Sequence, residues 1–174
     1  MGEREVGELL SRVKLLVMDV DGTLTDGKVY YSVRGEELKV FSIRDGMGIG
    51  LMNIATLPTA IITSEDTEIV TARAKKLNIQ HVILGSRDKE KDLRSLAAKL
   101  NIELQEIAYI GDDINDIPAL QISGIAACPN NAVESVKSIC NFIAKSDGGN
   151  GAVRELIEAI LLSKNLSIYL PDNW

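Results

Sequence analysis

Histidine is nearly absent from this chain, and its absence removes whole classes of active site. His81 is the only histidine among 174 residues, so neither a zinc site built from several histidines nor a Ser-His-Asp triad is available. The two cysteines, Cys128 and Cys140, lie in apolar sequence without a CxxC spacing. We therefore expect buried, reduced thiols and no disulfide framework.

Two further absences concern partners and location. The chain has no basic excess, because its formal net charge is −6, whereas proteins that bind nucleic acid carry a basic surface. It has no apolar run of transmembrane length, and its first residues are charged and amphipathic, unlike a signal peptide. We therefore expect no nucleic-acid partner, no membrane partner and a cytoplasmic location.

What the chain does contain is an alternation of short apolar runs with helical segments. This order predicts an α/β fold, a doubly wound parallel sheet with helices on both faces. The length suits one domain, which we expect to span residues 1–174. The predicted strands are residues 15–20, 58–63, 81–85, 106–111, 124–128 and 142–144.

Residues 28–43 interrupt this alternation. Aromatic and β-branched residues flank Arg34-Gly35-Glu36, a pattern that predicts a β-hairpin. A lone two-stranded hairpin is marginally stable in water and leaves its strand edges open. We therefore expect this hairpin to contact other subunits and to hold an oligomer together.

Two predictions concern the flanks of helices. Asp45 is predicted as the N-cap of a helix over residues 45–55, because an acidic side chain accepts hydrogen bonds from the first backbone N–H groups of a helix. Gly148-Gly149-Asn150-Gly151 is predicted as a flexible joint before a last amphipathic helix over residues 152–163.

Polar side chains cluster where the predicted strands end. The carboxyl ends of parallel strands meet at one edge of the sheet, where ligands bind. Carboxylates without histidine or cysteine favour a hard cation, above all Mg²⁺, and a lysine beside hydroxyls suits a phosphoryl group. The set predicts phosphoryl transfer to an aspartate nucleophile. Its members are Asp19, Asp21, Thr63, Ser64, Lys89, Asp112, Asp113 and Asp116.

Each of these residues alone has a plainer interpretation. Thr63 is then a strand-end hydroxyl, Lys89 a solvated helix start, and Asp112-Asp113 a helix cap favoured by the helix dipole. What indicates a common site is that these residues form four groups, which occur in order at the ends of four different strands.

The set resembles the four motifs of the haloacid dehalogenase-like (HAD) phosphatase superfamily. The matching segments are Asp19-Val20-Asp21-Gly22-Thr23, Thr63, Lys89 and Gly111-Asp112-Asp113-Ile114-Asn115-Asp116. Residues 35–39, 43–46 and 148–155 resemble its small capless branch, which includes the 3-deoxy-D-manno-octulosonate (KDO) 8-phosphate phosphatases. The resemblance implies a Rossmann-like core, a protruding hairpin in place of a cap domain, and a homotetramer assembled through the hairpins.

The resemblance also implies a role for each matching residue. Asp19 would attack phosphorus and form an aspartyl-phosphate, and Asp21 would serve as general acid and then as general base. Thr63, Ser64 and Lys89 would bind the phosphoryl group and the substrate. The implied Mg²⁺ ligands are Asp19, the backbone carbonyl of Asp21, and Asp112, with Asp113 and Asp116 in support.

The implied substrate is a phosphorylated 2-keto-3-deoxy sugar acid. Octulosonate phosphatases commonly show Thr-Gly-Arg where this chain has Thr63-Ser64-Glu65. Glu65 with Lys76 resembles relatives that act on nine-carbon acids such as 2-keto-3-deoxynononate (KDN) 9-phosphate. We place the nine-carbon type, KDN 9-phosphate or N-acylneuraminate 9-phosphate, just ahead of KDO 8-phosphate. Arg73 is a candidate for the substrate carboxylate, in its own or a neighbouring subunit, against the alternative of an ordinary surface arginine.

Other functions are compatible with parts of this pattern. One is a phosphomutase or a phosphatase of broader sugar-phosphate specificity. Another is a non-catalytic oligomerisation module of a sialic-acid-activating enzyme, against which the intact pair Asp19 and Asp21 argues. A third is a phosphate-accepting receiver domain, in which no second aspartate follows the acceptor by two residues.

Overall fold

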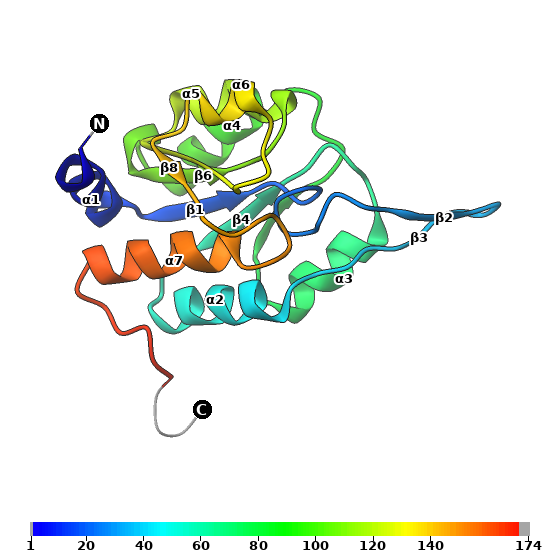
Figure 1. Cartoon of the computed structure of the whole chain (residues 1–174), viewed down its shortest axis with the longest axis horizontal. Coiled ribbons are helices and arrows are strands. Elements are labelled where there is room, and N and C mark those ends of the chain that lie inside the picture. The colour runs from blue at the N-terminus through cyan, green and yellow to red at the C-terminus, as the bar shows by residue number, and fades with distance from the viewer. Residues whose placement is uncertain (1, 171–174) are drawn as a thin grey trace.

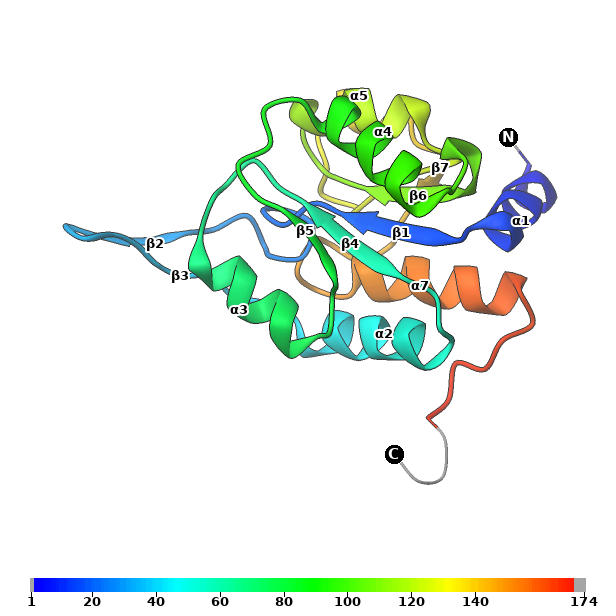
Figure 2. The ribbon, with the colours of Figure 1, turned by 180° about the vertical axis from the view of Figure 1, so that it is seen from behind.

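Six parallel strands form the centre of the computed structural model, which describes residues 2–170 apart from the side chain of Glu3. Their order across the sheet is β5-β4-β1-β6-β7-β8 (Figures 1 and 2). The predicted α/β fold with a parallel sheet is confirmed, and each strand is one or two residues shorter than predicted. The strands are β1 (Leu15–Met18), β4 (Thr59–Ile62), β5 (His81–Ile83), β6 (Ile107–Ile110), β7 (Ile125–Cys128) and β8 (Phe142–Ile143).

Helices cover both faces of the sheet (Figure 1). Alternate residues of β1 enter two different cores, since successive side chains of a strand point to opposite faces. Leu16 and Met18 pack with α1 (Glu3–Arg12), α2 (Ile43–Ile54), α3 (Glu68–Lys76) and α7 (Ala152–Ser163). Leu15 and Val17 pack with α4 (Lys89–Leu100), α5 (Ile117–Ile122) and α6 (Glu134–Lys137). No helix in the described part of the chain is both long and apolar enough to cross a membrane.

The path of the chain reverses across the sheet between β1 and β6. From β1 it proceeds to β4 and β5 with α2 and α3 on one face, and from β6 to β7 and β8 with α5 and α6 on the other. The loops that leave β1 and β6 therefore diverge, which opens a crevice at the carboxyl ends of these two neighbouring strands. Asp19 follows β1 directly, and Asp112 lies two residues beyond β6, so both carboxylates lie at this crevice.

The predicted hairpin is present but shorter than residues 28–43. β2 (Tyr30–Ser32) and β3 (Gly35–Leu38) pair antiparallel with a register shift at Tyr30/Tyr31, and they project away from the six-stranded sheet (Figures 1 and 2). A single antiparallel bridge between Thr25 and Phe41 closes the base of the hairpin. Residues 28–29 and 39–42 connect the hairpin to the core, and Ile43 already belongs to α2.

The prediction that Asp45 caps its own helix is wrong. The Ser42 side chain accepts hydrogen bonds from the next backbone N–H groups, so α2 begins two residues earlier than expected. The Asp45 carboxylate instead accepts hydrogen bonds from the backbone N–H groups of Gly151 at 3.2 Å and Arg154 at 2.9 Å. Asp45 therefore caps α7 from a distance, since the N-cap glycine of that helix has no side chain to do so.

The segment predicted as a flexible joint is anchored to the loop that follows β1. The N–H of Gly148 donates to Asn131, and the N–H of Gly149 donates to the Thr23 carbonyl, both at 2.9 Å. A Cβ on Gly148 would lie 1.7 Å from the Gly22 carbonyl oxygen, so only glycine permits this approach. The glycines support the loop that carries Asp21.

Candidate active site

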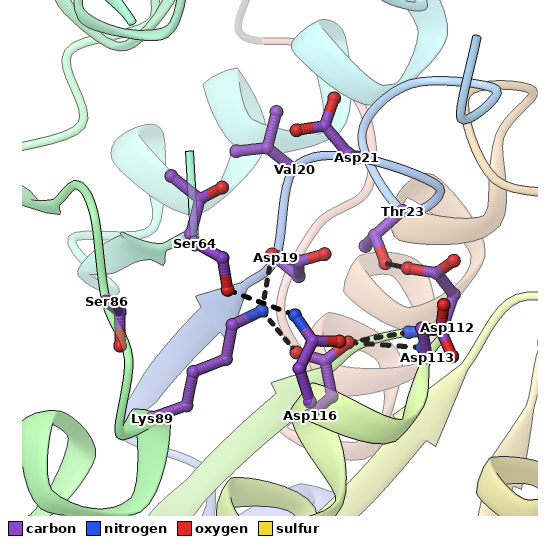
Figure 3. A network of polar contacts seen from close by, with 12 residues as sticks. Asp19, Val20, Asp21, Thr23, Ser64, Ser86, Lys89, Asp112, Asp113 and Asp116 are labelled. Carbon is purple, nitrogen blue, oxygen red and sulfur yellow. Dashed lines mark hydrogen bonds and ion pairs between the residues drawn. The ribbon is translucent and has the colours of Figure 1, made fainter. Parts of the chain in front are cut away.

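A buried lysine links two carboxylates at the centre of the crevice. The Nζ of Lys89 lies 2.6 Å from Asp19 Oδ1 and 2.6 Å from Asp116 Oδ1 (Figure 3). Lys89 is the first residue of α4, because the Asp88 side chain accepts from the Lys91 N–H and starts the helix there. All three charged residues are at most 4 % exposed, which is rare for charged groups unless they are paired.

Asp112 approaches the same point from the end of β6. Its Oδ1 accepts a hydrogen bond from the Thr23 hydroxyl at 3.1 Å, so the loops after β1 and β6 are joined here. Gly22 has a φ of +86°, and a Cβ on it would lie 1.9 Å from Asp112 Oδ2. The glycine of the Asp21-Gly22-Thr23 motif thus serves both the left-handed turn and the close approach of Asp112.

The cluster has more carboxylates than cations. Lys89 remains charged, since Asp19 and Asp116 outweigh the effect of burial and raise its pKa. Burial, and next the charge of Asp116, raise the pKa of Asp19 to about 8 and that of Asp112 to about 7. One ammonium group therefore leaves uncompensated negative charge in a buried site, and a bound cation would remove this cost.

The geometry fits a divalent cation. One carboxylate oxygen each from Asp19, Asp112 and Asp116 lies within 4.8 Å of the other two. Oδ1 of Asp116 already accepts from Lys89 and from the Tyr109 hydroxyl, and its Oδ2 accepts from the backbone N–H groups of Asp112 and Asp113. Asp19 and Asp112 therefore offer the available oxygens, and Asp116 orients both Lys89 and the loop that carries Asp112 (Figure 3).

A pocket of about 410 Å³ opens beside Lys89. Ser64, directly beyond the end-of-β4 residue Thr63, lines it, and the Ser64 hydroxyl accepts a hydrogen bond from Asn115 at 3.1 Å. Thr63 itself is buried, and its hydroxyl accepts from the Glu65 N–H at 3.4 Å. The pocket is large enough for a small polar ligand, and its lining residues are Ser64, Ser86, Arg87, Asp88, Lys89, Asn115 and Pro118.

The remaining residues predicted for the site lie away from Lys89 and its pocket. Glu65 is exposed. Arg73 donates to the Ser42 carbonyl at 2.9 Å and stacks on Phe41 at 5.3 Å, away from the pocket. Arg73 and Lys76 instead line a separate groove between α2 and α3. Within one chain, neither is brought to Lys89, and a role for them in a neighbouring subunit stays a prediction.

The side chains of Asp113 and Asp21 do not belong to the cluster of candidate metal ligands. The exposed Asp113 accepts from the Ile114 N–H at 2.7 Å and caps the 3₁₀ helix η2 (Ile114–Asp116). The Asp21 carboxylate lies away from Lys89 (Figure 3) and is paired with Lys39 at 2.5 Å. The Asp21 side chain is therefore separate from the acidic cluster, as a role in proton transfer requires.

Sequence reasoning missed two members of the site. Tyr109 is fully buried in β6 and donates to Asp116 Oδ1 at 2.8 Å; a tyrosine within an otherwise aliphatic strand was the available signal. Lys39 lies in the chain returning from the hairpin; the resemblance of residues 35–39 to the capless branch included it but implied no role for it.

Comparisons with known proteins agree with this geometry. Residues 57–156 match the haloacid dehalogenase-like hydrolase family. The 3-deoxy-D-manno-octulosonate 8-phosphate phosphatase KdsC of Yersinia pestis is 35 % identical over 161 residues, which cover 92 % of this chain and 86 % of that protein. The corresponding phosphatase of Escherichia coli K12 is 36 % identical over 87 % of this chain and 81 % of that protein.

Solved structures show the same likeness. The 3-deoxy-D-manno-octulosonate 8-phosphate phosphatase of Moraxella catarrhalis, in complex with a magnesium ion, a phosphate ion and a KDO molecule, has a TM-score of 0.92, with 40 % identity and 94 % of each chain covered. The cobalt-bound phosphatase of Haemophilus influenzae has a TM-score of 0.88, with 34 % identity over 90 % of this chain and 92 % of that one. The chain therefore belongs to the haloacid dehalogenase-like hydrolases, in the family of the 3-deoxy-D-manno-octulosonate 8-phosphate phosphatases, and is a phosphomonoester hydrolase of that type.

Proposed function

We propose that this phosphatase removes the terminal phosphate of a 2-keto-3-deoxy sugar acid by way of an aspartyl-phosphate on Asp19. The observation that carries the proposal is the Lys89 ammonium held between Asp19 and Asp116, with Asp112 at the neighbouring strand end. Lys89 lowers the pKa of the nucleophilic carboxylate against the effect of burial, and it lowers the repulsion between that carboxylate and a phosphate dianion.

Two displacements at phosphorus complete the reaction. In the first, an Asp19 oxygen bonds to phosphorus, the bond to the sugar oxygen breaks, and Asp21 gives its proton to that oxygen. In the second, water attacks phosphorus, Asp21 takes the water proton, and the bond to Asp19 breaks to release inorganic phosphate. Ser64, which lies just beyond β4, lines the pocket beside Lys89, where it would contact the phosphoryl group and the sugar.

The acidic site fits Mg²⁺, the ion in the Moraxella catarrhalis complex. Asp19 and Asp112 would hold it through their available carboxylate oxygens, and Asp116 would orient the loop around it. When bound, Mg²⁺ neutralises negative charge on the transferring phosphoryl group.

KDO 8-phosphate is the substrate that the relatives support, and a comparison of kcat/KM on eight- and nine-carbon substrates tests it. We expect KDO 8-phosphate to be preferred over KDN 9-phosphate by about tenfold or more, the usual effect of a small added group in a fitted pocket. Failure to hydrolyse either compound would contradict the proposed function.

The nine-carbon preference is the alternative, and its support is the acidic Glu65 at a position where a basic residue is common. If Glu65 sets the choice, KDN 9-phosphate has the higher kcat/KM, and Glu65→Gln shifts the ratio toward the eight-carbon acid. Glu68→Gln is the matched control, since Glu68 is also an exposed acid and begins α3. An unchanged ratio in Glu65→Gln would remove Glu65 from substrate selection.

We further propose that the hairpin joins four subunits. Its apolar side chains have little cover within one chain: Tyr31 is 73 % exposed, Val33 105 % and Leu38 61 %. In the described part of the chain, β2 and β3 pair only with each other. Such a projecting apolar surface is typical of an interaction site.

A charge on the hairpin should dissociate the oligomer. We expect Tyr31→Asp to lower the mass measured by light scattering from that of a tetramer toward that of a monomer. Tyr31 is a better position than Phe41, which already packs under Arg73. Tyr169→Asp is the control, because Tyr169 is 78 % exposed but lies outside the hairpin. A tetramer that survives in Tyr31→Asp would exclude the hairpin as the main contact.

A further inference from the structure

Lys39 is a buried lysine on an otherwise exposed segment. Its side chain is 0 % exposed, whereas Leu38 and Val40 on either side are 61 % and 51 % exposed. An ammonium group is costly to bury unless carboxylates pair with it. Lys39 Nζ lies 2.5 Å from Asp21 Oδ1 and 2.7 Å from Glu36 Oε1, so the lysine joins the base of the hairpin to the loop after β1.

This contact decides how the Asp21 carboxyl group is held. Its Oδ1 is paired with Lys39, and its Oδ2 is buried without a hydrogen-bond partner among the described residues. Figure 3 shows the Asp21 carboxylate away from the Lys89 cluster, so that cluster does not orient it. Oδ2 is therefore the oxygen available to exchange a proton, because Oδ1 already accepts a hydrogen bond from the Lys39 ammonium group.

We propose that Lys39 is a positioning residue for the proton transfers of Asp21. This inference rests on the proposed function. By holding Oδ1, Lys39 leaves Oδ2 to give its proton to the sugar oxygen when that oxygen leaves phosphorus, and to take the proton of the attacking water afterwards. Glu36 also pairs with the Lys39 ammonium, from the hairpin side. The orientation of Asp21 therefore depends on the position of the base of the hairpin.

The dependence of rate on the leaving group tests this role. A sugar hydroxyl is a poor leaving group and needs the proton, whereas p-nitrophenyl phosphate releases a stable phenolate that does not. We expect Lys39→Met to lower kcat/KM for the sugar phosphate about 10- to 100-fold, but that for p-nitrophenyl phosphate less than about threefold. The ratio kcat/KM is the right quantity because it reports the steps up to release of the first product, before water attacks.

Variants at neighbouring positions make the result specific. Asp21→Asn should show the same selective loss, to a greater extent. Lys28→Met is the matched control, because Lys28 is an exposed lysine that pairs with Asp26 at 2.8 Å, and both activities should stay unchanged. If Lys39→Met does not fold, Glu36→Gln/Lys39→Met removes the repulsion between the two carboxylates that the lysine had separated.

Several outcomes would overturn the inference. Equal losses on both substrates would mean that Lys39 serves only the structure, and an unchanged sugar-phosphate activity would mean that Asp21 needs no such support. If Asp21→Asn shows the selective loss and Lys39→Met does not, the inference about Lys39 fails while the proposed function stands. A wild-type protein that hydrolyses neither substrate would instead contradict the proposed function itself.

Discussion

Replacing Asp19 by asparagine is expected to abolish phosphate release, with a loss of at least ~10⁴-fold in kcat, because an amide oxygen is a poor nucleophile toward phosphorus. The fold should survive. Lys89 keeps its partner Asp116 at 2.6 Å. The neutral amide also replaces a carboxylate whose pKa is raised by burial. We therefore expect Asp19→Asn to unfold at the wild-type temperature or above it, measured at about pH 8 without metal.

A control variant and a trapping experiment make this result specific to the nucleophile. Asp113→Asn changes an exposed acid that only caps η2, and it should retain activity within a few-fold. Asp21→Asn, incubated with p-nitrophenyl phosphate, should retain a phosphoryl group on Asp19 that mass spectrometry detects after acid quenching. Substantial turnover by Asp19→Asn, or a phosphoryl group found on another residue, would remove Asp19 from the role of nucleophile.

Removal of the metal should also have a large effect on the rate. We expect chelation to reduce hydrolysis to below about 1 % of its starting rate, and added Mg²⁺ to restore it, because little else offsets the charge of the transferring group. Ca²⁺ is the comparison, since it binds carboxylates but prefers more ligands and a looser geometry. Full activity of the chelated protein would exclude a metal-dependent mechanism.

The pH dependence of metal binding follows from the carboxyl groups. Burial raises the pKa of Asp19 to about 8 and that of Asp112 to about 7, so the metal-free folded protein holds protons that the unfolded chain has lost. Its stability should therefore fall as the pH rises from about 5 to 8. A metal must displace these protons, so its apparent affinity rises over the same interval.

Thermal unfolding measures this linkage directly. One displaced proton changes the apparent affinity about tenfold per pH unit, which corresponds to about 1.4 kcal/mol and to about 3–6 °C in Tm for a chain of this size. The increase in Tm caused by Mg²⁺ should thus be several degrees larger at about pH 8 than at about pH 6. In Asp112→Asn this pH dependence should be weaker. An equal increase at both pH values would show that protons and metal do not compete.

The fold and the centre of the site were predictable because local sequence carries their signal. β1 is apolar on both faces, so it had to be a buried strand, and the polar residues after β4, β5 and β6 follow from where those strands end. Parallel strands then bring Asp19, Lys89 and Asp112 to one edge without any further information.

The errors arose where a side chain acts on a distant segment. The type and position of Asp45 are typical of a local helix cap, yet its carboxylate accepts hydrogen bonds from the N–H groups of Gly151 and Arg154, more than a hundred residues away. The glycines before α7 have the composition of a flexible joint, yet they pack directly on the loop after β1. A sequence window contains neither partner, so the local interpretation was the only one available.

The amino-acid sequence alone determined the α/β class, the parallel sheet and the identity of the acids and the lysine at its edge, because strand burial and strand ends are local properties. Only the tertiary structure decided which carboxylate does what: Asp116 is saturated by Lys89, Tyr109 and two backbone N–H groups, Asp112 remains available beside Asp19, and Asp21 is held apart by Lys39. The physical reason is that the role of a carboxylate depends on which donors and charges surround it, and these come from segments that meet only when the chain is folded.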